Sequence, residues 1–482
     1  MTPQIAETHV GLVVLVGDRA YKTKKAVRTA FLDFSTAELR RAALCRELEL
    51  NRRLAPDVYL GIATFTDPDG GTEAVLVMRR MPAERRLATL VAAGAPVSDA
   101  LRDLAKLMAV FHARARRTPE ITADGGAPAL RGRWAANVTE LAPYRDRVLP
   151  AADVDEIGRL ALRFVDGRGD LFRSRCAEGR VVDGHGDLIA DDVFCLDDGP
   201  RVLDCLDFDA RLRHVDGLDD VAFLAMDLER LGRPDLAGDF LDAYAEFAGD
   251  PAPAALRHHY IAYRALVRAK VACLRHDQTG AQTDAETART YAAMALRHLR
   301  TGAVRLVLVG GLPGTGKSTV AGALADACSA ALLSSDRIRK ETAGLDPHTP
   351  AGAGFGQGLY APERTEQLYG ELLRRAERLL ARGESVVLDA SWICAEHRAA
   401  AADVAGRTVS DLVELQCRAP AELAARRIRS RGPTASDATA EIAAAMAEAA
   451  DPWPRATVVD TSGSVGESLE QALRAWEAGP PA

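Results

Sequence analysis

Residues 304–318 read VRLVLVGGLPGTGKS, and this stretch decides how the second half of the chain folds. It opens with six residues that are almost all apolar, as in a strand buried on both faces of a parallel sheet. The glycine-rich turn that follows spaces Gly311, Gly316, Lys317 and Ser318 as G-x-x-x-x-G-K-[ST]. Glycines let backbone N–H groups curl around a phosphate, and the start of the next helix adds its positive end, so the stretch predicts a nucleotide-phosphate site.

Each part of this turn has an expected role in binding ATP. Lys317 is expected to reach the β- and γ-phosphates and to act in catalysis, and Ser318 to give an oxygen to Mg²⁺. The full set expected to contact the nucleotide is Gly311, Leu312, Pro313, Gly314, Thr315, Gly316, Lys317, Ser318 and Thr319.

Further strands are expected near residues 331–334, 385–389, 413–417 and 457–460, with helices between them. Strands that alternate with helices predict a parallel, doubly wound sheet, in which ligands bind at the carboxyl ends of the strands. Asp389 ends one expected strand and is a candidate Mg²⁺ ligand, and Asp336 follows another. The alternative roles are a strand-end turn for Asp389 and a helix N-cap for Asp336.

An arginine cluster lies on the expected helix 420–430 and just after it: Arg426, Arg427, Arg429 and Arg431. It could close over transferring phosphates, with Arg427 as the candidate ligand, or be a solvated helix face. Together these features resemble the small P-loop kinases of the gluconate kinase, zeta toxin and polynucleotide kinase group, over about residues 304–462. The resemblance implies that Asp336 is the substrate-side base and that the arginines form a lid.

In the first half, residues 185–192 read HGDLIADD, just before an expected strand at 193–196. Protein kinases use H-x-D-L-x-x-x-N, in which the Asp accepts the proton of the substrate hydroxyl and the Asn binds Mg²⁺. Asp187 corresponds to that catalytic Asp. Asp192 stands where the Asn is expected, and its carboxylate is still a hard oxygen ligand. Asp204 and Asp207 end a second expected strand, at 202–206, where the kinase metal-binding Asp would lie.

These residues resemble the aminoglycoside phosphotransferases and related small-molecule kinases. The resemblance favours Asp204 over Asp207 as the metal ligand. It also implies that Lys22, in an expected hairpin of strands at 10–16 and 20–27, binds the α- and β-phosphates. The partner of such a lysine is a Glu on the next helix, and Glu47 stands on a predicted apolar stripe of that helix, formed by Leu39, Ala43, Leu50 and Leu54. A carboxylate on an apolar stripe needs a cation, which Lys22 or the alternative Lys24 would supply.

Both halves together resemble a bacterial two-domain family. The expected fold class is α/β and α+β, in two domains. Residues 1–302 would form a bilobal, protein-kinase-like (aminoglycoside phosphotransferase-like) domain, with a small lobe of about 1–85 and a large lobe of about 86–302. Residues 303–482 would form a doubly wound P-loop domain.

The charge of the chain limits its partners. Its 61 Lys and Arg against 68 Asp and Glu give a net charge of −7, whereas a protein that coats nucleic acid carries a basic surplus. No apolar run approaches the roughly 18–20 residues that span a bilayer, and the start of the chain has no export-signal pattern. The eight cysteines form no CxxC pair. We therefore expect a cytoplasmic protein with reduced thiols and no membrane or nucleic-acid partner, and its oligomeric state stays open.

The leading hypothesis is an enzyme with two ATP·Mg²⁺ sites that phosphorylates a small hydroxylated molecule, such as a sugar, an aminoglycoside or a similar alcohol. A second hypothesis is a nucleotide-dependent regulator whose first half is a pseudokinase, because that half has no G-x-G-x-x-G lid and has Asp192 in place of Asn. A third is end-phosphorylation of nucleic acid by the P-loop half, against which the acidic balance argues.

Overall fold

The structure, a computed structural model, describes residues 4–7, 11–28, 33–66, 71–346, 357–430 and 439–479. Its internal contacts divide the chain into two compact units. The first comprises residues 1–158, 172–252 and 257–299, and the second comprises 159–171, 253–256 and 300–482. Residues 159–171 thus group with the second unit although they lie in the first half of the sequence.

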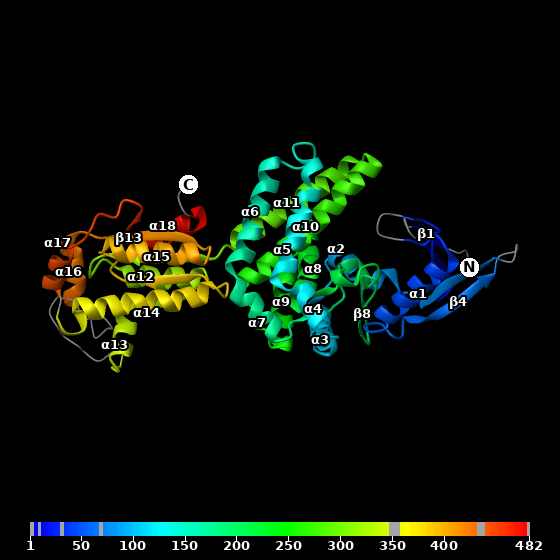
Figure 1. The fold of residues 1–482 in the computed structure, drawn as a ribbon, viewed down its shortest axis with the longest axis horizontal. Helices are drawn as coiled ribbons and strands as arrows, with labels where there is room; N and C mark the ends of the chain where they lie inside the picture. The colour runs from blue at the N-terminus through cyan, green and yellow to red at the C-terminus, as the bar shows by residue number, and fades with distance from the viewer. Residues whose placement is uncertain are drawn as a thin grey trace. The chain divides into compact units, whose positions relative to one another are not determined.

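The first unit begins with a five-stranded antiparallel sheet in the order β1-β2-β3-β5-β4, against which one helix packs (Figure 1). Its elements are β1 (Gln4–Glu7), β2 (Gly11–Val16), β3 (Arg19–Lys24), α1 (Ala37–Asn51), β4 (Tyr59–Thr66) and β5 (Thr72–Arg79). The predicted hairpin is confirmed: Val16 pairs with Arg19, which leaves Gly17 and Asp18 as a two-residue turn. Gly17 has a φ of 58°, a left-handed conformation that glycine adopts at no steric cost.

Helix α1 buries a different face from the one predicted. Leu39 is 42% exposed, whereas Leu44 is fully buried and packs in one cluster with Leu76 of β5. The predicted stripe through Leu39 and Ala43 was therefore wrong in its first turns, because the sheet takes up the neighbouring face of the helix. Glu47 lies on the buried face nonetheless and is 1% exposed.

The chain from residue 87 to residue 301 is mainly helical. The helices are α2 (Leu87–Ala92), α3 (Ser98–Arg114), α4 (Pro119–Gly125), α5 (Ala127–Glu140), α6 (Ala151–Gly167), α7 (Gly169–Ala177), α8 (Gly217–Arg230), α9 (Pro234–Ala248), α10 (Ala254–Thr279) and α11 (Gln282–Thr301). Two short antiparallel pairs flank the 184–192 segment in sequence: β6 (Val181–Asp183) with β9 (His214–Asp216), and β7 (Val193–Leu196) with β8 (Gly199–Val202).

The strand expected at 202–206 was placed too late in the sequence. Leu196 pairs with Gly199, so the turn consists of Asp197 and Asp198 alone and β8 already ends at Val202. The following residues are consequently outside the two-stranded sheet. Asp204 adopts a left-handed conformation there, with a φ of 60°, which is uncommon for a residue other than glycine.

The second unit is built on a five-stranded sheet in the order β11-β12-β10-β13-β14, and all of its strand pairs are parallel. The strands are β10 (Arg305–Gly310), β11 (Ala331–Ser334), β12 (Val386–Asp389), β13 (Asp411–Arg418) and β14 (Thr457–Asp460). The helices are α12 (Lys317–Ala327), α13 (Ser335–Thr342), α14 (Pro362–Leu380), α15 (Ala395–Arg407), α16 (Ala421–Ser430), α17 (Ala440–Glu448) and α18 (Val465–Ala478). The predicted doubly wound parallel sheet is confirmed.

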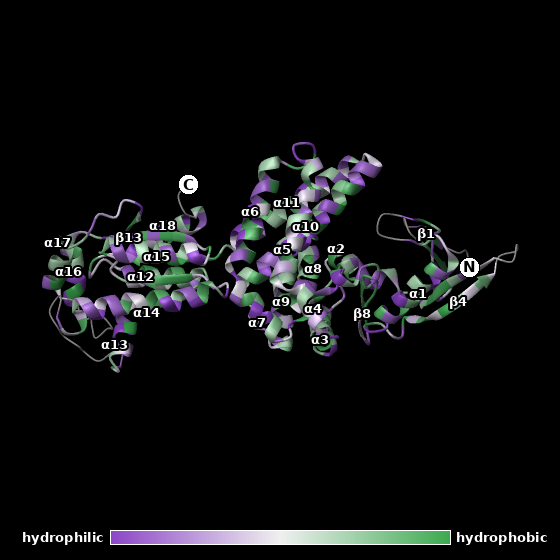
Figure 2. Ribbon diagram, viewed as in Figure 1, coloured by the Kyte–Doolittle hydropathy of each residue, from purple (hydrophilic) through white to green (hydrophobic). Residues whose placement is uncertain are grey.

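Helices cover both faces of this sheet. Val307 and Val309 of β10 pack with Leu324 of α12 in one buried cluster, to which α18 also contributes. The alternate residues Leu306 and Leu308 are equally buried and point to the other face, where α14 contacts β11 and β12. The ribbon around α12 and the central strands lies at the hydrophobic end of the scale (Figure 2). Because all five strands are parallel, their carboxyl ends meet at one edge.

Within the described residues, no helix combines the length and the apolar character that crossing a membrane requires. All eight cysteines are free thiols, and four of them are buried: Cys195, Cys205, Cys273 and Cys417.

Candidate functional site

The glycine-rich turn joins β10 to α12 at the carboxyl edge of the parallel sheet. Gly311, Gly314 and Gly316 have φ values of 147°, 80° and 81°. A Cβ built on Gly314 would lie 2.5 Å from the carbonyl oxygen of Ala424, and one on Gly311 would lie 2.7 Å from that of Cys417. Both the backbone conformation and the close approach therefore require glycine.

Hydrogen bonds hold the turn in this curved shape. The Thr315 hydroxyl donates to the carbonyl of Leu312 over 2.7 Å, and the Thr461 hydroxyl donates to the carbonyl of Thr315 over 2.7 Å. Arg427 in turn donates from Nη2 to the carbonyl of Thr461 over 2.8 Å. A Cβ on Gly316 would lie 3.6 Å from Nη1 of Arg427, so this guanidinium lies beside the turn.

Arg427 is the member of the predicted arginine cluster that the structure brings to the turn. Its Nη1 is buried and has no hydrogen-bond partner among the described residues, so it could bind an anion. Arg426 and Arg429 are exposed, as in a solvated helix face. Arg431 lies outside the described residues.

Asp389 is buried at the end of β12, in register with Ser334 of β11. Burial raises the pKa of its carboxyl group; the charge of Lys317 opposes the rise, and that of Asp336 adds to it. The Oδ1 atom of Asp389 is buried and lacks a hydrogen-bond partner in the described part of the chain. Such an oxygen beside Ser318 suits a Mg²⁺ ion, which uses one or two protein oxygens together with phosphates.

Asp336 lies in the first turn of α13, immediately after β11. The residue at the N-cap position is Ser334, so Asp336 does not have the alternative role of an N-cap. Its half-buried carboxylate is near enough to Asp389 and to Tyr369 of α14 to raise the pKa of both. It therefore lies at the same sheet edge as the glycine-rich turn.

In the first unit, five side chains of alternating charge form a continuous cluster. Lys22 Nζ lies 2.7 Å from Oε1 of Glu47 and 3.0 Å from Oδ1 of Asp204. Lys24 Nζ lies 2.8 Å from Oε2 of Glu47 and 3.1 Å from Oδ2 of Asp207. The sequence left open whether Lys22 or Lys24 pairs with Glu47, and in the structure both do. Lys22 also pairs with Asp204, and Lys24 with Asp207.

The electrostatic balance of this cluster favours charged lysine. Burial alone would lower the pKa of Lys22, but the carboxylates of Glu47 and Asp204 outweigh it and raise the pKa well above its ordinary value. Lys22 therefore stays protonated and can bind a phosphate group.

Two residues that the sequence analysis missed hold the segment that carries Asp204. The Tyr59 hydroxyl accepts a hydrogen bond from the backbone N–H of Asp204 over 3.1 Å, and Oδ1 of Asn51 accepts one from that of Cys205 over 2.9 Å. Asn51 lies one helical turn after Glu47, so a second polar residue on the same face of α1 was an available signal. Tyr59 had none, because its role depends on the tertiary fold.

His185 is fully buried and connects the Asp187 loop to the Asp204 segment. Its Nε2 donates to the carbonyl of Leu203 over 3.0 Å, and its Nδ1 accepts from the backbone N–H of Asp187 over 3.4 Å. Burial lowers the pKa of His185, so the ring is neutral, as this bonding pattern requires. The structure therefore gives His185 a positioning role.

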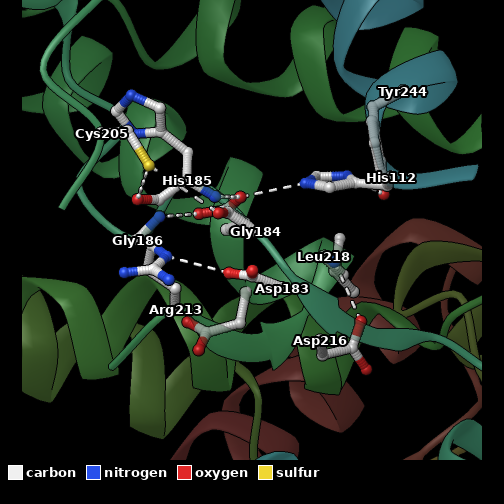
Figure 3. A network of polar contacts seen from close by, with 12 residues as sticks. His112, Asp183, Gly184, His185, Gly186, Cys205, Arg213, Asp216, Leu218 and Tyr244 are labelled. Atoms are coloured by element: carbon white, nitrogen blue, oxygen red, sulfur yellow. Dashed lines mark hydrogen bonds and ion pairs between the residues drawn. The ribbon is translucent and has the colours of Figure 1, made fainter. Parts of the chain in front are cut away.

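A buried carboxylate fixes the loop from the other side. Asp220 accepts hydrogen bonds from the backbone N–H groups of His185 (2.7 Å) and Gly186 (2.8 Å) and from Nε2 of His112 (3.0 Å). Figure 3 labels His112, His185 and Gly186 among these groups, and it shows Tyr244 next to His112, whose Nδ1 lies 2.9 Å from the Tyr244 hydroxyl. Burial would raise the pKa of Asp220, but the bonds from His112 and the backbone hold it far below its usual range.

Three carboxylates of the first unit lie close enough to repel one another. Burial, and then the charges of Asp204 and Asp187, raise the pKa of Asp192 well above its ordinary value. No group of three or more His, Cys, Asp or Glu residues in the described ranges is arranged to hold a metal ion alone. Two carboxylates that would be completed by phosphate oxygens are nevertheless the usual surroundings of Mg²⁺.

Known proteins match the chain over nearly its whole length or over one part of it. The uncharacterized protein Rv2004c of Mycobacterium tuberculosis (strain ATCC 25618 / H37Rv) is 46% identical over 473 residues, which are 98% of this chain and 95% of that protein. The chain belongs to the same family. A family model described as an AAA domain matches residues 306–453.

Two solved structures each match one part of the chain. A gluconokinase from Sinorhizobium meliloti 1021 is 20% identical, with a TM-score of 0.28, and the match covers 37% of this chain and 94% of that chain. A choline/ethanolamine kinase family protein from Mesorhizobium loti is 15% identical, with a TM-score of 0.38, and the match covers 62% of this chain and 92% of that chain. The chain's own elements confirm the predicted architecture of an antiparallel sheet with its helix, a mainly helical part and a doubly wound parallel sheet with the glycine-rich turn.

The crowding at Gly314 leads to a first prediction. Gly314→Ala places a Cβ against the Ala424 carbonyl and should weaken ATP binding to the second unit by at least about tenfold, measured by calorimetry. The matched control is Gly322→Ala in α12, where an added Cβ meets nothing within 4 Å. This control should keep the affinity and gain about 0.5–1 kcal/mol of stability. Equal affinities in the two variants would contradict the role of the turn.

The depressed pKa of Asp220 leads to a second prediction. Its ionised form stabilises the fold above about pH 4, where an unfolded Asp is charged, and this contribution is lost progressively as the pH falls further. Asp220→Asn should lower the free energy of unfolding at pH 7 by about 3–5 kcal/mol and flatten its decline below pH 4, in urea titrations of the full chain.

Asp235→Asn is the control for this experiment, because the exposed Asp235 pairs with Arg233 at the surface. It should change the free energy of unfolding by less than about 1 kcal/mol. An unchanged pH dependence in Asp220→Asn would show that Asp220 does not hold the loop as a carboxylate.

Proposed function

We propose that the chain is an ATP- and Mg²⁺-dependent phosphotransferase that acts on a small hydroxylated molecule and has two nucleotide sites. The observation that carries this proposal is the meeting of Lys22, Glu47 and Asp204 in one charge cluster. The three residues come from a strand, a helix and a loop that are far apart in sequence. Protein kinases use such a Lys–Glu ion pair together with a metal-binding Asp to hold the phosphates of ATP, and the cluster has the same residue types in the same chain order.

In the first unit, Lys22 would bind the α- and β-phosphates while Glu47 holds its side chain in place. Asp187 would accept the proton of the acceptor hydroxyl, since its loop is fixed by His185 and Asp220. Asp192 and Asp204 would hold Mg²⁺, which neutralises phosphate charge when bound. Most of the rate enhancement would come from holding the acceptor hydroxyl in line with the γ-phosphate and from stabilising the charge on the transferred phosphoryl group.

In the second unit, the glycine-rich turn would bind the phosphates of a second ATP through its backbone N–H groups. Lys317 and the unpartnered Nη1 of Arg427 would neutralise the charge on the transferred group. Ser318 and Asp389 would hold Mg²⁺, and Asp336 would accept the proton of the acceptor at the same sheet edge.

One observation favours the alternative that the first unit binds nucleotide without turnover. No G-x-G-x-x-G precedes Lys22 in the sequence, so the first unit lacks the glycine-rich loop with which a protein kinase covers the phosphates. In that case the first unit would act as a nucleotide-dependent regulator.

Two substitutions separate the activities of the units. Lys317→Ala should abolish ATP consumption by the second unit, because it removes the lysine of the glycine-rich turn, and Asp187→Asn should abolish that of the first. The measurement is ADP release by the full chain with a library of hydroxylated metabolites. Undiminished turnover in Lys317→Ala, with no further loss in the double variant, would rule out the proposed roles of both residues.

Binding stoichiometry is a separate test of the two-site proposal. Calorimetry of the full chain with ATP analogues and Mg²⁺ should give two sites per chain. Lys317→Ala and Lys22→Ala should each remove one of them, since each deletes the lysine proposed to bind the phosphates of one site. One site in the unsubstituted chain would leave only one functional unit.

A further inference from the structure

Helix α10 carries two arginines one turn apart beside the loop of Asp187. Nη1 of Arg264 donates to the carbonyl of Gly186, the residue before Asp187, over 3.2 Å. The guanidinium carbons of Arg264 and Arg268 lie 4.9 Å and 6.0 Å from the ring centroid of the same residue, Phe223. Two positive charges therefore lie on the side of the loop where α10 packs.

One of these arginines has an unused donor. Arg264 is 4% exposed, and its Nε donates to Oδ1 of Asp219 over 2.8 Å. Its Nη2 is buried and has no hydrogen-bond partner in the part of the chain that the structure describes. A buried cationic donor without an acceptor is unfavourable, so a ligand that brings an acceptor to it would be stabilised.

The carboxylates around the loop are already engaged. Asp219 pairs with Arg264, and Asp220 accepts three hydrogen bonds as described above. Asp227 accepts from the backbone N–H of Ala190 over 2.9 Å and from Nε of Arg230 over 2.6 Å. These three acids are therefore poorly placed to recognise an additional cation.

Both arginines and carboxylates act on Asp187. Burial raises the pKa of Asp187; the charges of Arg268 and then Arg264 oppose this rise, whereas those of Asp204 and Asp227 add to it. These two carboxylates already have cations of their own, Lys22 and Arg230, and the two arginines remain as the charges that an acceptor would meet. An ammonium group on an acceptor molecule would meet the same two arginines and be repelled, whereas a carboxylate or phosphate would be attracted.

We propose that the acceptor of the first unit is an anionic alcohol, that is, a hydroxylated carboxylic acid or a phosphate ester. Arg268, with Nη2 of Arg264, binds its negative group while its hydroxyl faces Asp187. The hydroxyl oxygen forms a bond to the γ-phosphorus of ATP, the bond from that phosphorus to the bridging oxygen breaks, ADP leaves, and the hydroxyl proton passes to Asp187. The inference rests on the proposed kinase function of this unit and narrows its substrate class.

The test uses the full chain with Lys317→Ala, so that only the first unit transfers phosphate. Four matched compounds differ only in the group at C1: glucitol (neutral), gluconate (carboxylate), glucitol 1-phosphate (phosphate ester) and 1-amino-1-deoxyglucitol (ammonium). Binding is measured by calorimetry in the presence of ADP and Mg²⁺, and turnover by ADP release from ATP. We expect at least one anionic compound to exceed the ammonium compound by about tenfold or more in affinity and in kcat/KM. The two anionic arms distinguish a carboxylate site from a phosphate site.

A variant on the same helix links the preference to Arg268. Arg268→Gln should raise the KM of the anionic compound by about tenfold and leave the KM of ATP unchanged, and Arg268→Lys should restore part of the loss. The control is Arg275→Gln, in which an exposed arginine of α10 that faces Asp284 is replaced. It should match the parent chain.

The outcomes separate this inference from the kinase function. Anion binding that depends on Arg268 but comes without turnover would overturn the kinase function and keep the anion site. Turnover that prefers the ammonium compound, or no preference among the four compounds in either measurement, would overturn the anion site.

Discussion

The burial of one carboxylate, that of Glu47, is the constraint on which the first unit depends. With 1% of its surface exposed, the charge cannot be solvated by water and must be met by cations of the chain. Lys22 and Lys24 meet it from adjacent same-face positions of β3, and each lysine also contacts an Asp of the 204–207 segment. The cluster thereby joins the helix, the sheet and the loop around Lys22, the lysine for which we propose phosphate binding.

Removing one member of such a cluster has effects beyond its own contact. Without Lys22, Glu47 would keep only Lys24, and Asp204 would lose the cation that balances it. Asp204 has a left-handed backbone conformation, which residues other than glycine rarely adopt. The hydrogen bonds that Tyr59 and Asn51 accept from the backbone of Asp204 and Cys205 hold the segment in this conformation. Site geometry and stability are therefore coupled in this lobe.

The second unit could be predicted from sequence far better than the first. The strands β10 and β12 are buried along their whole length and are continuous apolar runs, so both were predicted to within one residue of their observed bounds. In the small lobe, β1 and β4 escaped prediction, since most of their described residues are exposed or half-buried and leave no such run. Helix α1 misled the pattern analysis because it buries charged residues among its apolar ones.

The candidate sites likewise contain some residues that the sequence predicts and others that only the structure reveals. The residue types and spacing around Lys317 and Asp187 indicate the chemistry directly, because it needs those groups at those intervals. The supporting residues do not follow from local pattern: Thr461 reaches the glycine-rich turn only because β14 lies beside β13 in the sheet. Arg264 and Arg268 are two arginines among many in the sequence, and only the structure shows that α10 brings them close to the loop of Asp187.

The bonds from Thr315, Thr461 and Arg427 hold the glycine-rich turn curved by contacts internal to the protein. The turn already has its curved conformation before a ligand binds, so the backbone loses little conformational entropy on binding. Affinity at such a site is set mainly by the charge and fit of the incoming group, and the cost of ordering the backbone has been met during folding.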